Sequence, residues 1–165
     1  FDVFAAASFA CQHHFSKVIG TARPDDDDVA EIEKFALSVA QWLSKSEAKC
    51  IEHRNILAES EVKPYYIPLG EDMQPAKFLK AVPKTVEELC DGCGVCVKAC
   101  PVASISSDYM TITGPCIKCQ ACIIKCHSGA KYFDDEAFLS HVRMLETNYN
   151  KRAANFALIE KTGEV

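Results

Sequence analysis

Eight of the ten cysteines in this chain fall into two copies of one pattern, all between positions 90 and 126. Each copy reads Cys-x2-Cys-x2-Cys-x3-Cys, and the copies run from Cys90 to Cys100 and from Cys116 to Cys126. A chain of 165 residues with this many cysteines is either a disulfide scaffold or a metal protein. Cysteines that crowd one loop at three-residue steps are poor disulfide partners for one another, so the spacing favours metal.

The spacing within each copy also favours an iron–sulfur cluster over zinc. Structural zinc sites typically combine two short Cys-x2-Cys knuckles that a long loop separates. Here three cysteines share each loop and a fourth follows at x3, which is the run typical of bacterial 4Fe–4S ligation. We therefore predict two 4Fe–4S clusters, with zinc and disulfides as weaker alternatives.

The fourth cysteine of each copy is expected to serve the cluster of the other copy. It lies four residues beyond its loop, where a short helix would carry it away, and in the bacterial pattern it ligates the other cluster. Since such clusters pass single electrons, the predicted function class is electron transfer. Two ligand sets follow: set 1 comprises Cys90, Cys93, Cys96 and Cys126, and set 2 comprises Cys116, Cys119, Cys122 and Cys100.

Small and apolar residues lie between the predicted ligands. Gly92 and Gly94 would let backbone N–H groups of the first loop turn toward cluster sulfurs, which is one influence on a reduction potential. In so small a module the clusters would themselves be the core, so their removal should unfold it. The residues expected to exclude water are Val95, Val97, Val102, Ile105, Ile117, Ile123 and Ile124.

Three histidines lie where a chemical role is conceivable. His127 takes the place that Pro101 occupies after the fourth cysteine of the first copy, and it adds a titratable ring near one cluster. We expect a solvated ring, with a pH-coupled potential as the alternative. His13 and His14 fall between an expected strand and an expected helix, where α/β folds place ligand-binding groups. A role near a flavin or at an interface therefore competes with ordinary surface positions.

Residues 1–59 hold one expected strand and one expected helix. The near-continuous apolar run of residues 1–10 predicts a strand buried on both faces, as in a parallel sheet. The acidic run Asp25–Asp28 follows a proline and signals a helix start, because carboxylates complement the free N–H groups of a first turn. It lacks the glycine and glutamate of a calcium-binding EF-hand loop. Apolar residues at helical spacing predict a helix from about Asp26 to Ser46, with a weak continuation toward Leu57.

Three further regions complete the chain. Residues 60–83 carry four prolines and little periodicity, which indicates a linker that lies against a surface. The cysteine module occupies 84–133, with a short hairpin predicted at 103–113 and a strand at 130–133. Residues 134–165 form a predicted C-terminal helix, opened by acidic residues, and a tail. The helix is expected to present Phe138, Val142, Leu145 and Tyr149 on one face and to carry Arg143, Lys151 and Arg152 toward its C-terminal end.

The net charge limits the classes of binding partner that we expect for this chain. The net charge is −5, and each 4Fe–4S core with its four thiolates should add roughly −2. This argues against nucleic acid and favours a redox partner with a basic docking patch.

No run approaches the ~18 apolar residues of a membrane span. Cys11 and Cys50 stand apart as expected free thiols, which together with oxygen-sensitive clusters indicates the cytoplasm. The first residue is not methionine, so we expect that the native chain begins earlier.

The module with its eight cysteines resembles bacterial-type two-cluster ferredoxins. A wider resemblance rests on residues 5–10, on His14-Phe15-Ser16 and on Arg23-Pro24-Asp25, which precede a helix, a linker and the repeat. This order is similar to the C-terminal part of flavodoxin–ferredoxin fusion proteins. The resemblance implies an α+β chain, in which a strand–helix remnant of a flavodoxin-like α/β domain precedes a pseudo-twofold two-cluster module of short hairpins and short helices with flanking helices.

The resemblance also implies what this stretch lacks. The phosphate-binding strand and loops of flavodoxins are not in these residues, so FMN would bind only with a full flavodoxin-like domain upstream. The N-terminal strand would need a partner, and pairing with a second copy in a homo-oligomer is one expectation. We expect an electron carrier rather than a catalyst by itself, at low potential, between a flavin domain or reductase and an acceptor. Two alternatives stay open: the electron-input part of a flavin-dependent oxidoreductase, and clusters that serve as structural staples or a redox sensor.

Overall fold

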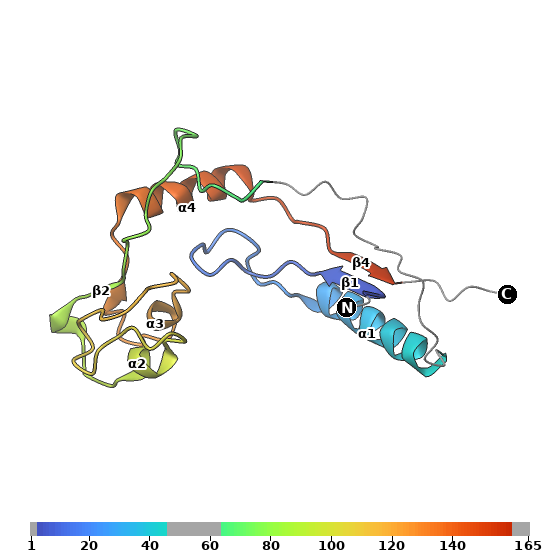
Figure 1. The fold of residues 1–165 in the computed structure, drawn as a ribbon, viewed down its shortest axis with the longest axis horizontal. Coiled ribbons are helices and arrows are strands. Elements are labelled where there is room, and N and C mark those ends of the chain that lie inside the picture. Colours follow the sequence, from blue (N-terminus) through green and yellow to red (C-terminus); the bar gives the residue numbers. More distant parts are fainter. Residues whose placement is uncertain (1–2, 46–63, 160–165) are drawn as a thin grey trace. The chain divides into compact units, whose positions relative to one another are not determined.

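The computed structural model describes residues 3–45 and 64–159, and it divides the chain into two compact units (Figure 1). Among the described residues, unit 1 consists of 3–13, 17–45, 64–65 and 150–159, and unit 2 consists of 14–16 and 66–149. Both units therefore combine segments that are far apart in the sequence. No helix within the described ranges is long and apolar enough to cross a membrane.

Unit 1 contains the long helix α1 (Asp26–Lys45), whose start was predicted and is confirmed. The backbone N–H of Asp28 donates to Asp25 Oδ1 over 3.1 Å, and the N–H of Asp25 donates to Asp28 Oδ2 over 3.0 Å. This reciprocal capping satisfies two of the N–H groups that a helix start leaves without partners. The expected continuation toward Leu57 lies outside the described residues.

The N-terminal strand differs from its prediction. Strand β1 (Ala5–Ser8) pairs antiparallel with β4 (Phe156–Ile159), with Ala5 opposite Ile159. A doubly buried strand in a parallel sheet was therefore wrong, because an antiparallel pair can leave one face in water. The strand has a partner in its own chain, and β4 lies in what was expected to be a tail.

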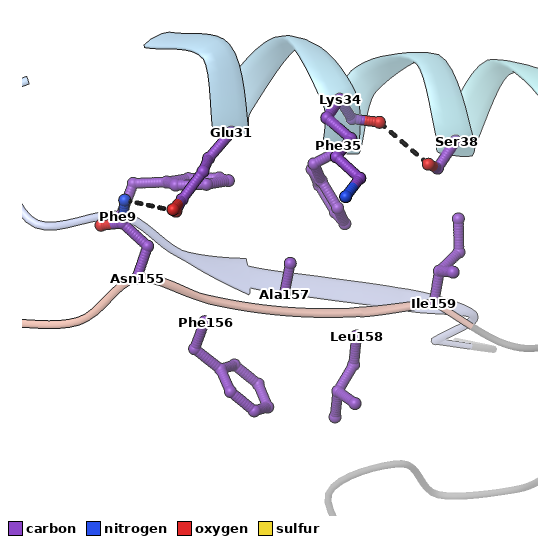
Figure 2. Close-up of a pocket in the computed structure, with 10 residues that line it drawn as sticks. All are labelled: Phe9, Glu31, Lys34, Phe35, Ser38, Asn155, Phe156, Ala157, Leu158 and Ile159. Carbon is purple, nitrogen blue, oxygen red and sulfur yellow. Dashed lines mark hydrogen bonds between the residues drawn. The ribbon is translucent and has the colours of Figure 1, made fainter. Parts of the chain in front are cut away.

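Helix α1 covers one face of this two-stranded sheet. Phe4 stacks on Trp42 at a centroid distance of 4.2 Å, and Phe9 meets Phe35 edge to face at 6.0 Å. Residues of α1 and β4 line a pocket of about 350 Å³. Figure 2 shows Phe156 on the sheet face that points away from the helix. Phe156 is half exposed.

A buried ion pair fastens the start of α1. The guanidinium of Arg23 donates to both carboxylate oxygens of Asp28, through Nε over 2.8 Å and through Nη2. Asn155 Nδ2 donates to the same carboxylate over 2.8 Å, and Arg23 Nη1 donates to the carbonyl of Ala153 over 2.6 Å. These hydrogen bonds, above all that from Arg23, hold the pKa of Asp28 well below its usual range. The network thereby joins the segment before α1 to the segment before β4.

Unit 2 holds the cysteine module, built from very short elements. Its strands β2 (Lys84–Thr85) and β3 (Lys131–Tyr132) pair antiparallel, so the strand predicted at 130–133 is confirmed. The predicted hairpin is confirmed by the bridge between Ile105 and Ile112. The helical elements of the module are η1 (Glu87–Leu89), α2 (Val95–Ala99) and α3 (Ala121–Ile124).

Helix α4 (Glu136–Asn148) and the linker complete unit 2. Asp135 caps the helix by accepting from the N–H of Phe138 over 2.9 Å, which confirms the predicted acidic start. Phe138 is buried and contacts the rings of Phe78 and Phe133. The ring of His141 bonds to the carbonyl of Leu69 over 2.8 Å. The linker thus lies along α4, and its predicted packing against a surface is confirmed from residue 66 onward (Figure 1).

The remaining expectations for α4 hold in part. Phe138 and Val142 are buried, whereas Tyr149 follows the helix end and is exposed. Arg143 lies within the helix, where Nε bonds Glu71 over 2.7 Å and Nη2 bonds Glu136. Lys151 and Arg152 lie beyond the last helical residue.

Candidate iron–sulfur centre

The first cysteine loop is wound by glycines. Gly92 and Gly94 both have φ of +70°, a left-handed conformation that costs glycine little. A methyl group at either position would lie 3.4–3.5 Å from the ring of Tyr109, so this ring covers the loop. Asp91 Oδ1 accepts from the N–H of Cys93 over 3.2 Å. The turn leads directly into α2, which begins at Val95 and carries Cys96.

The second loop adopts the same backbone conformation without glycine. Lys118 and Gln120, twenty-six residues after Gly92 and Gly94, both have φ of +58°. The correspondence extends to the end of each copy, where Ala103 matches Gly129 at φ of +48° and +68°. Residues other than glycine are strained at positive φ. The second loop therefore repeats the backbone conformation of the first at a local cost in free energy. The sequence repeat is thus also a conformational repeat.

Four cysteines line one cavity of unit 2, and they are the members of set 2: Cys100, Cys116, Cys119 and Cys122. The rest of the lining is mostly apolar and includes Ile105, Ile112 and Phe133. Cys100 belongs to the first copy, whereas the other three belong to the second. Cysteines of both copies therefore line one cavity, and the rest of its wall is mostly apolar.

One hydrogen bond joins the residues that directly follow two members of set 1. His127 Nε2 and Asp91 Oδ2 lie 2.8 Å apart, and these residues follow Cys126 and Cys90 directly. Ligand atoms of Asp91, Cys93 and His127 lie within 4.8 Å of one another, all three residues being exposed. The fourth cysteine of the second copy thus lies at the first loop. The ring of His127 is 63% exposed, in line with the expected solvated position.

The core of the module joins the two sets. Cys96 of set 1 and Cys122 of set 2 are both buried and pack with Ile105. Partly buried residues complete this cluster: Val97, Cys100, Tyr109, Ile112 and Ile123. Some of the residues predicted to exclude water belong to it, namely Val97, Ile105 and Ile123. Three others are exposed: Val102, Ile117 and Ile124.

Polar groups around the sulfurs affect the two sets differently. Burial raises the pKa of the Cys122 thiol to about 11, and the positive charge of Lys131 opposes this rise. Burial also acts on Cys126, but hydrogen bonds from the Ser128 hydroxyl and from backbone N–H groups of Lys131 and Ala130 outweigh it and lower the pKa of that thiol. Metal binding needs the thiolate, so these donors favour the ligating form at Cys126.

Hydrogen bonds from the backbone to sulfur occur after the fourth cysteine of each copy. The N–H of Ser104 donates to Cys100 Sγ over 3.3 Å. The expected donors lay in the glycine loop instead, and the residues after the fourth cysteine had no sequence signal for this role. Such N–H groups are suited to cluster sulfurs and thiolates, which accept charge-assisted bonds.

The other candidate residues lie outside this centre. His14 is exposed and His13 is partly buried, both in the loop after β1, and a role near a flavin stays a prediction. Cys11 is exposed, and its role as a free thiol stays a prediction. Cys50 lies outside the described residues.

Residues 83–106 match the family model of the 4Fe–4S binding domain. The matched stretch includes Cys90, Cys93, Cys96 and Cys100. The chain carries an iron–sulfur, ferredoxin-like module. The match supports at least one 4Fe–4S cluster and, in general terms, an electron-transfer role. Neither a curated protein nor a solved structure matches the chain.

Proposed function

We propose that this chain transfers single electrons through two 4Fe–4S clusters, one held by set 1 and the other by set 2. The observation that carries the proposal is the cavity lined by the four cysteines of set 2, three from the second copy and Cys100 from the first. The hydrogen bond between Asp91 and His127 supports the same crossed arrangement for set 1. The spacing argues against zinc, because three cysteines of each set come from one loop, whereas structural zinc sites typically combine two Cys-x2-Cys knuckles.

A 4Fe–4S cluster, when bound, accepts and releases one electron without making or breaking bonds to a substrate. The chain's own groups then hold it, shield it and set its potential. Thiolates provide the ligands, and the N–H of Ser104 donates to one of the sulfurs. Ile105 and Ile112 line the set 2 cavity and limit access of water. These are the contributions that a carrier protein makes to electron transfer.

The partner side of the proposal rests on charge and on resemblance. The chain is anionic before any cluster is counted, with a net charge of −5, so a redox partner with a basic docking surface suits it. We place the carrier at low potential in the cytoplasm, between a flavin domain or reductase and an acceptor. The flavodoxin-like origin of residues 1–59 belongs to the same proposal.

Anaerobic purification with metal analysis tests the proposal. We expect about eight irons and about eight sulfides per chain, broad visible absorbance, and a spin-coupled EPR signal after dithionite reduction. Stoichiometric zinc without visible absorbance would overturn it. About four irons with a signal free of spin coupling would reduce it to a single cluster.

A further inference from the structure

Lys131 is a buried cation held by neutral oxygen atoms. Only 3% of this residue is exposed, although lysine is almost never buried unless it is paired. Its Nζ donates to the hydroxyl of Thr85 over 2.6 Å and to the carbonyl of Tyr109. Among the residues that the structure describes, no carboxylate forms an ion pair with it. Neutral oxygens therefore hold the ammonium group in a fixed place, and no carboxylate within 3–45 or 64–159 compensates its charge.

The cysteine repeat shows that the position does not require a lysine. Lys131 lies twenty-six residues after Ile105, which occupies the equivalent place in the first copy and is 6% exposed. Both residues follow the fourth cysteine of their copy by five positions. An apolar side chain thus suits this buried position, whereas an ammonium group there carries a desolvation cost. That cost calls for a compensating negative charge.

The negative charge that the module itself offers is that of its proposed clusters. Strand β3, which carries Lys131, packs against α3, which carries Cys122. The backbone N–H of Lys131 donates to the sulfur of Cys126, so this residue lies beside ligand cysteines of both sets. A 4Fe–4S core with its four thiolates carries a net negative charge, so it would supply the compensation that the described carboxylates do not.

We propose that Lys131 is a fixed internal counter-charge that stabilises the reduced form of the cluster nearer to its ammonium group, so that this cluster accepts an electron before the other. The inference rests on the proposed function. When the site takes up one electron from a one-electron donor, it gains one negative charge and no bond changes. The added negative charge strengthens the attraction between the cluster and a fixed cation in a site of low dielectric, and this makes reduction more favourable. The first copy, with Ile105 in this place, has no such cation.

Substitution of Lys131 by methionine tests the role of the charge, because methionine is neutral and of similar length. The two midpoints are measured by EPR-monitored redox titration with dithionite as the electron source. We expect the higher midpoint to fall by about tenfold in the reduction equilibrium constant, which is about 59 mV for a one-electron couple. The lower midpoint should move less. Lys98→Met is the matched control, since Lys98 is an exposed cation between two ligand cysteines and water screens its charge.

Two more variants separate charge from packing and folding. Lys131→Arg keeps the charge, and both midpoints should stay near those of the parent. Lys131→Gln is neutral but keeps an N–H donor for Tyr109, and it should repeat the shift of Lys131→Met. If both neutral variants load no iron while Lys131→Arg loads fully, the cation is needed to hold the cluster and the charge role stands.

The proposal is overturned if the iron-loaded neutral variants leave the higher midpoint unchanged. It is also overturned if Lys98→Met shifts that midpoint as far, or if Lys131→Arg behaves like Lys131→Met in its midpoints or in its iron loading. Failure of the proposed function would look different, because the parent protein itself would then lack about eight irons or the spin-coupled signal.

Discussion

The two copies of the cysteine motif have the same left-handed backbone conformation at matching positions, but their side chains differ. The first copy uses Gly92 and Gly94 where the second uses Lys118 and Gln120, in the same left-handed conformation. The first has Ile105 where the second has Lys131. The ligand spacing therefore dictates the path of the chain, while the residues around it differ in charge, strain and hydrogen bonding. The comparison teaches that a near-symmetric scaffold can give its two metal sites different properties.

Removal of the clusters should have the largest effect, and it tests whether the copies are independent. The core of the module joins Cys96, Ile105 and Cys122 from both copies, so loss of the clusters should unfold both together. Hydrogen exchange after iron chelation should show that amides across 84–133 lose nearly all protection. Trp42, the only tryptophan, stacks on Phe4 in unit 1, and its fluorescence serves as a control because no ligand cysteine lies there. Protection retained in one copy would show that the copies fold separately.

Substitution of the fourth cysteines should have the next largest effect, since it tests the crossed ligand sets. Cys126→Ser should remove about half of the iron and the same EPR component that Cys93→Ser removes. Cys100→Ser should instead remove the component lost in Cys119→Ser. The reason is that Cys100 lines a cavity together with cysteines of the second loop. His127, which follows Cys126, instead bonds to Asp91 of the first loop. If each fourth cysteine pairs with the loop of its own copy, the crossed assignment is refuted.

Glycine substitutions compare the strain in the two loops. Gly94→Ala places a side chain at φ of +70° and should lower the free energy of unfolding of the loaded protein by about 1 kcal/mol. Gln120→Gly relieves the same kind of strain in the second loop, but glycine also loosens the unfolded chain, so a change within about 0.5 kcal/mol is expected. Anaerobic urea unfolding, followed through visible absorbance, measures both. An equal loss in both variants would mean that the side chain of Gln120 stabilises the loop.

Features that depend on near neighbours in the sequence were predicted well. The start of α1 follows from Asp25 and Asp28, which cap each other across three residues. The cysteines, the hairpin bridge between Ile105 and Ile112 and the short strand β3 follow from equally local patterns. In each case the residues that stabilise the element lie within a few positions of it.

Features that depend on distant residues were missed or wrong. Strand β4 is four residues long, and it is stabilised by pairing with β1 at the other end of the chain. Without that pairing, the residues 1–10 were assigned to a parallel sheet. The burial of Lys131 likewise needs Thr85 and the carbonyl of Tyr109, which come from other segments. A lysine in a short strand has no local signal that distinguishes it from a solvated one.

The smallest effect is expected at His127, which differs from Pro101 in the first copy. His127→Ala removes the bond to Asp91, but both side chains are at least half exposed, so the melting temperature should change by about a degree or less. Ser128→Ala is the matched comparison, because the Ser128 hydroxyl lies 3.5 Å from Cys126 Sγ. Loss of a hydrogen bond to a ligand sulfur should lower one EPR midpoint more than His127→Ala does. If His127→Ala gives the larger shift, the exposed pair with Asp91, rather than the bonds to sulfur, distinguishes the second copy from the first.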